Sequence, residues 1–299
     1  MASLPASLPA WFAACRFIHF AALIQLAGVL LFSERLAPPA LQPLLRRAFR
    51  RSQSGLALVG LLTAIALLAL QAGLMGQGWP DTLRLEVWRA VLHISFGQVW
   101  FWHLMLVLAT CGATLGAMAS PWRYPLLLML SMAALLSLAF TGHAAMYDGL
   151  RGAAQRCNQM LHLLAVAGWL GGLWPLLLTL RWLRCVRLRA GALTALMAYS
   201  RSGHVWVALV ILTGVMNTSL VLGHWPLALG QPYSRMLLIK TAAVAAMVIL
   251  ALTNRYRIVP TMRTDEPRAI KRLTLLTLME IALGALALLL VSVFAMLEP

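Results

Sequence analysis

Charged side chains are scarce in this sequence of 299 residues, and acidic ones are the scarcest. Only 11% of the residues are charged and only 8 are Asp or Glu, whereas about a quarter of an ordinary soluble domain is charged. With so little polar surface, a chain of this length cannot cover a water-soluble globule. Cysteine is also rare, at four residues, which is too few for a disulfide scaffold of this size. Soluble enzymes, secreted disulfide scaffolds and disordered chains are therefore excluded.

Long apolar runs take the place of the missing charge. Hydrophobic residues make up 62% of the chain, and the mean hydropathy is +0.84. A helix needs about 20 mostly apolar residues to cross a bilayer. The sequence therefore predicts an all-α polytopic membrane protein with eight transmembrane helices and the lipid bilayer as its partner. The eight runs lie near residues 10–32, 55–75, 96–118, 124–143, 160–180, 203–223, 236–254 and 273–296.

The basic residues orient the predicted bundle. The net charge is +16, and all the basic side chains except Lys240 and Lys271 are arginines. Most of them follow the first, third, fifth and seventh apolar runs. Because Lys and Arg collect in cytoplasmic loops, both termini are expected outside the cytoplasm, in an N-out/C-out topology. No basic stripe alternates with aromatic residues on a polar helix, so no nucleic-acid partner is expected.

The two halves of the sequence, residues 1–150 and 151–299, carry similar motifs in the same order. Each half has four predicted helices, and an even number of spans gives both halves the same orientation in the membrane. We therefore expect two parallel four-helix repeats with a site between them. The matching features are His19-x8-Gly28 with His162-x8-Gly171, Ser54–Gly55 with Ser202–Gly203, Trp79–Pro80 with Trp225–Pro226, and residues 96–103 with 233–240, which place His103 opposite Lys240.

Six of the seven histidines fall at or near the predicted outer ends of helices, together with several Met and Cys residues. Imidazole, thioether and thiolate groups suit copper, as Cu(I) or Cu(II). Mg²⁺ and Ca²⁺ prefer carboxylates, which are scarce here. Since the fourth helix ends where the fifth begins, His143 and His162 are expected at similar depth as the main ligands near the outer face. The other expected ligands are His19, the sulfur atoms of Met146 and Met160, and His103.

Each of these residues also has a purely structural explanation. Histidines of membrane proteins often lie in the interfacial belt or hydrogen-bond between helices, and methionine fills gaps in apolar cores. Cys15 and Cys157 occupy nearly matching positions and either supply thiolates or form a disulfide. Lys240 either tunes a nearby site or extends toward the membrane surface. Glu280 either pairs with an arginine or carries protons.

A set of motifs in the second half points to a family. They are His162 with Gly-Trp-Leu-Gly-Gly-Leu-Trp at 168–174, Ser202–Gly203, Gln-Pro-Tyr-Ser-Arg-Met-Leu-Leu-Ile-Lys at 231–240, Asn254–Arg255 and Glu280-x3-Gly284. This set resembles the copper resistance protein D family (CopD/PcoD), although Ser234 stands where Gly is expected. The first half is similar mainly in its helix plan and in His19. The resemblance implies a multi-pass protein of the bacterial inner membrane that takes copper from a periplasmic CopC-like carrier and moves it into the cytoplasm.

Copper transport and copper resistance are therefore the first functions expected. The chain has no ATP-binding loop and no phosphorylatable Asp motif, so it is not expected to be an enzyme. A haem-binding membrane cytochrome is the alternative, with His19 and His162, or His143 and His103, as axial ligands. A non-transporting copper sensor or docking protein is the third hypothesis.

Overall fold

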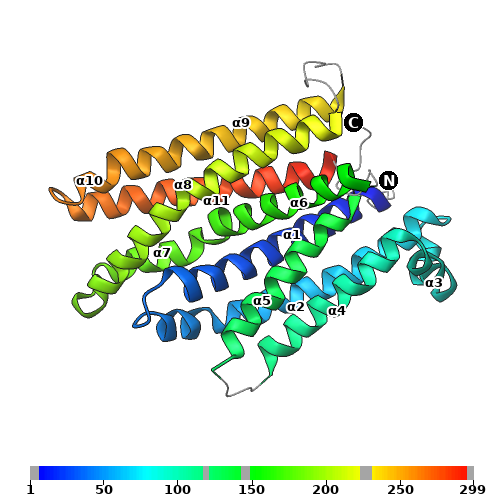
Figure 1. The fold of residues 1–299 in the computed structure, drawn as a ribbon, viewed down its shortest axis with the longest axis horizontal. Coiled ribbons are helices and arrows are strands. Elements are labelled where there is room, and N and C mark those ends of the chain that lie inside the picture. The colour runs from blue at the N-terminus through cyan, green and yellow to red at the C-terminus, as the bar shows by residue number, and fades with distance from the viewer. Residues whose placement is uncertain (1–6, 117–120, 143–148, 223–230, 295–299) are drawn as a thin grey trace, which may run out of the picture.

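The computed structural model describes residues 7–116, 121–142, 149–222 and 231–294. Within these ranges every regular element is a helix and no strand occurs. Eight helical segments there are long and apolar enough to cross a membrane, which confirms the predicted all-α polytopic architecture. Figure 1 shows these segments lying side by side in one bundle.

Several of the eight spans combine an α-helix with a short π-helical or 3-10 segment. In chain order the spans are α1 (Leu8–Leu31) with η1 (Phe32–Leu36); α2 (Gln42–Met75); α4 (Ser95–Leu115); α5 (Arg123–Ser137) with η3 (Leu138–Phe140); α6 (Gly149–Val166) with η5 (Ala167–Gly171) and α7 (Leu173–Trp182); α8 (Val186–Leu222); α9 (Pro232–Thr253) with η6 (Asn254–Ile258) and α10 (Val259–Thr261); and α11 (Glu266–Phe294).

Some helices extend well beyond the apolar runs that predicted them. The helix α2 begins at Gln42 rather than near residue 55, and α8 begins at Val186 rather than near residue 203. The additional turns are rich in arginine, which is a good helix former, so the helix continues outside the apolar layer. Counting apolar residues finds only the part of a helix that lies in hydrocarbon.

The segment between α2 and α4 lies outside the predicted apolar runs and is also largely helical. It forms η2 (Trp79–Leu83) and the short helix α3 (Leu85–His93). His93 is exposed at the end of α3, and its Nδ1 lies 2.7 Å from the carbonyl oxygen of Arg89 in the same helix. His93 therefore has a local partner and lies apart from the interior of the bundle.

The helix α1 joins the two halves. It packs against α2 and α5 from its own half and against η5 and α11 from the other half. At this contact Gly28 of α1 faces Gly171 of η5. A Cβ atom on Gly28 would lie 2.4 Å from the Cα of Gly171, and one on Gly171 would lie 2.8 Å from the Cα of Gly28. Only glycine permits so close an approach of two backbones, which explains the glycine in both matching motifs.

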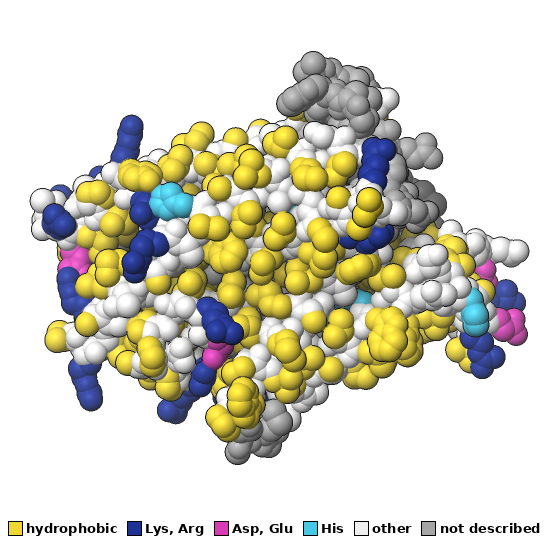
Figure 2. Space-filling view, viewed as in Figure 1, with side chains coloured by type: hydrophobic (Ala, Val, Ile, Leu, Met, Phe, Trp, Pro, Cys, Tyr) yellow, Lys and Arg dark blue, Asp and Glu magenta, His cyan; other side chains and the backbone are white. Residues whose placement is uncertain are grey.

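The face of the bundle drawn in Figure 2 is apolar along most of its length. Exposed residues such as Leu62, Leu212 and Ile249 come from different helices, as expected for side chains that face lipid. Arginines gather at the end of the bundle where α10 lies. The start of α1 and the end of α11 lie together at the opposite end (Figure 1). This arrangement is compatible with the expected N-out/C-out topology, and the orientation in the membrane stays a prediction.

Candidate metal centre

Two histidines meet in the interior of the first half. His19 of α1 and His103 of α4 are 0% and 1% exposed, and their Nε2 atoms lie 2.9 Å apart. The ring centroids are 5.0 Å apart, with an interplanar angle of 73°. Since α1 begins at Leu8, His19 lies roughly 16 Å along the helix axis. The pair is therefore deep in the bundle rather than near the outer face, where the sequence suggested a site.

A threonine of α2 determines which ring nitrogen of His19 carries the proton. Nδ1 of His19 lies 2.9 Å from Oγ1 of Thr63 and 3.2 Å from the carbonyl oxygen of Gly60. The Thr63 hydroxyl donates its own proton to the carbonyl of Val59, 2.6 Å away, so its oxygen accepts from the ring. Because both neighbours of Nδ1 are acceptors, we assign the ring proton of His19 to Nδ1. Nε2 then carries a lone pair.

A serine of α5 determines which ring nitrogen of His103 carries the proton. Nδ1 of His103 lies 2.8 Å from Oγ of Ser137, and the Ser137 hydroxyl donates to the carbonyl of Ala134, 2.7 Å away. The ring proton of His103 therefore also belongs on Nδ1. The two Nε2 atoms consequently direct lone pairs at each other across 2.9 Å. Two neutral rings in these tautomers repel each other, and a cation or a proton between the Nε2 atoms converts the repulsion into attraction.

An indole and a thiol lie beside the pair. Trp100, one turn before His103 on α4, has its ring centroid 4.8 Å from that of His103 and 6.0 Å from that of His19. Cys15 lies one turn before His19 on α1, and its thiol donates to the carbonyl oxygen of Thr63 at 3.5 Å. The first half thus places two imidazoles and a thiol near one another in an apolar interior.

A similar set of hydrogen bonds surrounds His162 of α6 in the second half. We call the hydrogen-bonded surroundings of His19 and of His162 the two cradles. Nδ1 of His162 lies 2.8 Å from Oγ1 of Thr213 on α8, and the Thr213 hydroxyl donates to the carbonyl of Leu209. Asn158, one turn before His162, donates to the carbonyl oxygen of Thr213 at 3.0 Å. Asn158 also donates to the side-chain oxygen of Asn217 at 2.8 Å, so this bond joins α6 to α8. His162 therefore also carries its ring proton on Nδ1.

Two ligand-type side chains differ between the two cradles. In the second half, Asn158 donates a hydrogen bond to the carbonyl oxygen of Thr213. In the first half, Cys15 donates the corresponding bond to the carbonyl oxygen of Thr63. Lys240 of α9 places its positive charge near His162, where the first half has His103. An amide and an ammonium group are poor ligands for a soft metal. The side chains around His19 are therefore better suited to copper than those around His162. The parallel between the cradles supports the expectation of two repeats, which stays a prediction.

The ligand set expected from the sequence is only partly within the described residues. His143 and Met146 lie outside them. His19 contacts His103 rather than His162, and His19 and His162 share no hydrogen bond or ring contact. Across the described ranges, no three His, Cys, Asp or Glu side chains form a group that could hold a metal ion. The structure thus brings together one pair from the expected set, and the ligand role of His143, Met146 and His162 stays a prediction.

The sulfur-bearing residues have separate surroundings. Cys15 is half-buried and Cys157 is exposed, and both are free thiols, so the disulfide considered from the sequence is wrong for this structure. The structural counterpart of Cys15 is Asn158, the residue after Cys157. Met160 packs against the apolar core that contains Trp100.

A second polar centre surrounds Glu280 of α11, which is 3% exposed. Its carboxylate accepts hydrogen bonds from Asn254 at 2.9 Å and from the indole of Trp169 at 3.4 Å. Asn254 and Trp169 belong to the π-helical segments η6 and η5, and such segments often occur at functional sites. No arginine of the described residues forms an ion pair with Glu280, so the expected Arg partner is wrong. Trp169, Asn254 and Glu280 all belong to the motifs that resemble the copper resistance protein D family, so three of those motifs meet at this centre.

The residues that fix the ring protons had no clear signal in the sequence. Thr63, Ser137 and Thr213 are ordinary hydroxyl residues of apolar helices, where bonding to the preceding turn is usual. The alignment of the halves did offer one signal, because it placed His103 opposite Lys240, and both lie near the histidine of their own half. That match predicted equivalent positions without predicting their contacts.

The fold and the buried imidazoles define a multi-pass membrane protein whose interior offers ligands for a soft metal. Residues 6–153 match the copper resistance protein D-like, N-terminal domain, and residues 193–294 match copper resistance protein D. The chain is 39% identical to inner membrane protein YebZ of Escherichia coli (strain K12) over 287 residues, which cover 96% of this chain and 97% of the relative. It is 30% identical to copper resistance protein D of Pseudomonas syringae pv. tomato over 310 residues, which cover 96% of each chain. The chain belongs to the copper resistance protein D family, and it is a multi-pass protein of the inner membrane.

Proposed function

We propose that this protein carries copper across the inner membrane as Cu(I), and that the His19–His103 pair binds the ion within the bundle. The observation that carries this proposal is the pair of opposed Nε2 lone pairs, 2.9 Å apart. A metal-bound histidine usually donates its other ring N–H to an oxygen atom, which fixes the tautomer. Thr63 and Ser137 provide that arrangement for both rings.

Charge and geometry favour Cu(I) over Cu(II) at this pair. The cost of moving an ion into a low-dielectric interior rises steeply with its charge, and the two neutral rings have no carboxylate beside them to offset a second positive charge. Imidazole is a suitable copper ligand. With metal–nitrogen bonds of about 2.0 Å, a linear site needs the Nε2 atoms about 4 Å apart. The pair therefore opens by about 1 Å from its present spacing when it binds the ion.

The position of Cys15 supports a route into the pair. With the arginine-rich end in the cytoplasm, Cys15 lies one turn nearer the periplasm than His19 on α1. A periplasmic CopC-like carrier would then deliver copper at the end of the bundle where α1 begins, and the Cys15 thiol would meet the ion before the pair does. The activity proposed is transport and not enzymatic catalysis. A haem fits this pair less well, because its macrocycle would have to enter between two buried imidazole rings whose Nε2 atoms lie 2.9 Å apart.

Uptake of Cu(I) into anaerobic proteoliposomes tests the transport function. Replacing His103 with alanine should lower the initial rate at least about tenfold, since loss of even an outer partner of a metal ligand costs about 10–100-fold. The control is His93→Ala, because His93 is exposed and bonded within its own short helix. Equal uptake by the parent and His103→Ala proteins would contradict the proposal. Copper binding without uptake in the parent would favour the sensor or docking hypothesis.

The comparison of the two cradles predicts a gain of metal binding. Replacing Asn158 with cysteine and Lys240 with histidine gives the second half the entry thiol and the second imidazole of the first half, so bound Cu(I) should rise from about one to about two ions per chain. Lys240→Met is the control, because it removes the charge without adding a ligand. Metal content of the purified proteins, measured after removal of free copper, provides the test. A folded double variant that still binds one ion would show that these two positions do not determine binding.

A further inference from the structure

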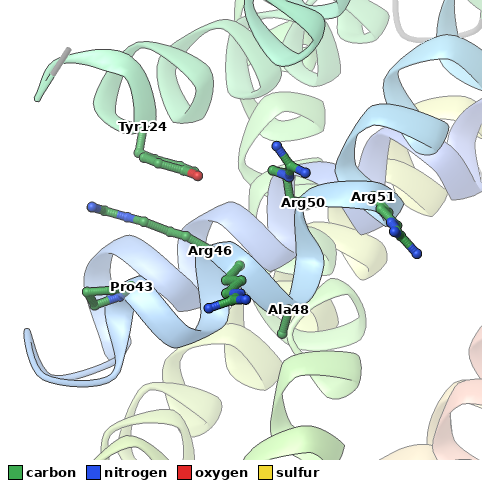
Figure 3. Close-up of a pocket in the computed structure, with 7 residues that line it drawn as sticks. Pro43, Arg46, Ala48, Arg50, Arg51 and Tyr124 are labelled. Carbon is green, nitrogen blue, oxygen red and sulfur yellow. The ribbon is translucent and has the colours of Figure 1, made fainter. Parts of the chain in front are cut away.

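Four arginines crowd the first turns of α2. A surface cavity of about 750 Å³ lies against them, as Figure 3 shows, and its lining residues are Pro43, Arg46, Arg47, Ala48, Arg50, Arg51 and Tyr124. Arg46 is paired with Glu34 at 2.5 Å, and its guanidinium group lies 4.3 Å from the ring centroid of Tyr124 on α5. One wall of the cavity is therefore already fixed by an ion pair and an aromatic ring.

The other three arginines have no acidic partner. Arg47, Arg50 and Arg51 are exposed, and none of them forms an ion pair within the described part of the chain. Like charges three and four residues apart on a helix repel one another. An anion in the cavity would relieve this repulsion.

An apolar stripe continues from the arginines along the same face of α2. Arg47, Arg51, Leu58, Leu62 and Ile65 follow one another at multiples of three and four residues, so they share one side of the helix. The three apolar residues are 44%, 57% and 42% exposed. Leu58 lies roughly 10 Å beyond Arg51 along the axis. A phosphate group at the arginines and a hydrocarbon chain along the stripe would fit this face together, and a phospholipid carries both groups in one molecule.

We propose that this cavity binds the headgroup of an anionic phospholipid, with its acyl chains along Leu58, Leu62 and Ile65. Basic pockets at the ends of membrane helices provide the charge that such headgroups require. Arginine suits this role because its planar group donates two parallel hydrogen bonds to phosphate oxygens. The proposal concerns the exposed face of α2 and is independent of the copper site.

Thermal unfolding of the purified protein in detergent tests the proposal, with phosphatidylglycerol as the added lipid. The parent should unfold at a higher temperature as phosphatidylglycerol is added, and the midpoint concentration of this effect gives the apparent affinity. Replacing Arg47 and Arg51 with glutamine should weaken that affinity about thirtyfold, from the contributions of two surface arginines. The matched control is Arg184→Gln with Arg187→Gln, which removes the same charge from exposed positions near the start of α8. The control should keep the affinity of the parent.

Each other outcome decides against the proposal. Equal weakening in both double variants would show that only the net charge matters. Equal stabilisation by phosphatidylcholine would show that the headgroup charge is not recognised, and equal stabilisation by inorganic phosphate would show a free-anion site without a lipid. If the Arg47 and Arg51 double variant is not recovered, Arg51→Gln alone should weaken the affinity about fivefold.

Discussion

Replacing His19 or His103 with alanine should lower the affinity of the purified protein for Cu(I) at least about 100-fold. Each substitution leaves a single buried Nε2 lone pair in place of two opposed ones. Loss of an outer partner of a metal ligand already costs about 10–100-fold, so loss of one of two ligands should cost more. Competition against a Cu(I)-specific chelator under anaerobic conditions measures this affinity.

Matched variants separate this site from other histidines. Thr63→Val keeps the shape of the side chain but removes the nearer of the two acceptors for Nδ1 of His19, so a loss of about tenfold is expected. Substitution of the exposed residues His93 or His204 by alanine should have no effect. If the His19 and His103 variants bind Cu(I) like the parent, copper binds elsewhere. The outer set expected from the sequence, His143 with His162, would then be the next to test.

Replacing Gly28 or Gly171 with alanine should destabilise the protein by about 3 kcal/mol or more, at the upper end of the range for overpacked interiors. This change in stability is opposite to the usual one, since replacing glycine with alanine in a helix interior ordinarily stabilises the helix by about 1 kcal/mol. The added Cβ atom would lie 2.4 Å from backbone atoms of the other half, and backbone cannot move aside as a flexible side chain can. Unfolding in detergent, followed by loss of helical circular dichroism, measures the change.

The control for this prediction is Gly55→Ala in α2. An added Cβ at Gly55 has nothing within 4 Å, so that variant should be as stable as the parent or slightly more stable. Gly203 in α8 has the same open surroundings and provides a second control. Unchanged stability of both Gly28→Ala and Gly171→Ala would show that the two halves do not approach each other as closely as the structure indicates.

The eight spans were predictable from the sequence because the transfer of apolar residues into a bilayer depends mainly on local composition. The same argument explains which helical segments were not predicted. Helical turns outside hydrocarbon, such as the start of α2 at Gln42, are not marked by hydropathy, and α3 is too short and too amphipathic to stand out. Gly28 and Gly171 occupy matching positions in the two halves of the sequence, but their direct contact depends on how the halves pack.

The candidate site was harder to predict than the spans. His19 was identified because an imidazole inside an apolar run is costly to insert and needs a reason to be there. Its direct contact with His103 was not predicted, because membrane helices such as α1 and α4 are apolar on all sides, so the pattern of residues does not show which face turns inward. Packing sets that rotation, and it directs His103 toward His19 while Ser137 and Thr63 hold the rings.

X-ray absorption spectroscopy of the copper-loaded protein tests the central claim most directly. The His19–His103 site predicts a Cu(I) edge and two imidazole nitrogen atoms at about 2.0 Å, with no sulfur ligand at about 2.3 Å. The same measurement on His103→Ala should no longer show the two-nitrogen site. A spectrum dominated by sulfur ligands, or a two-imidazole spectrum that persists in His103→Ala, would contradict the assignment.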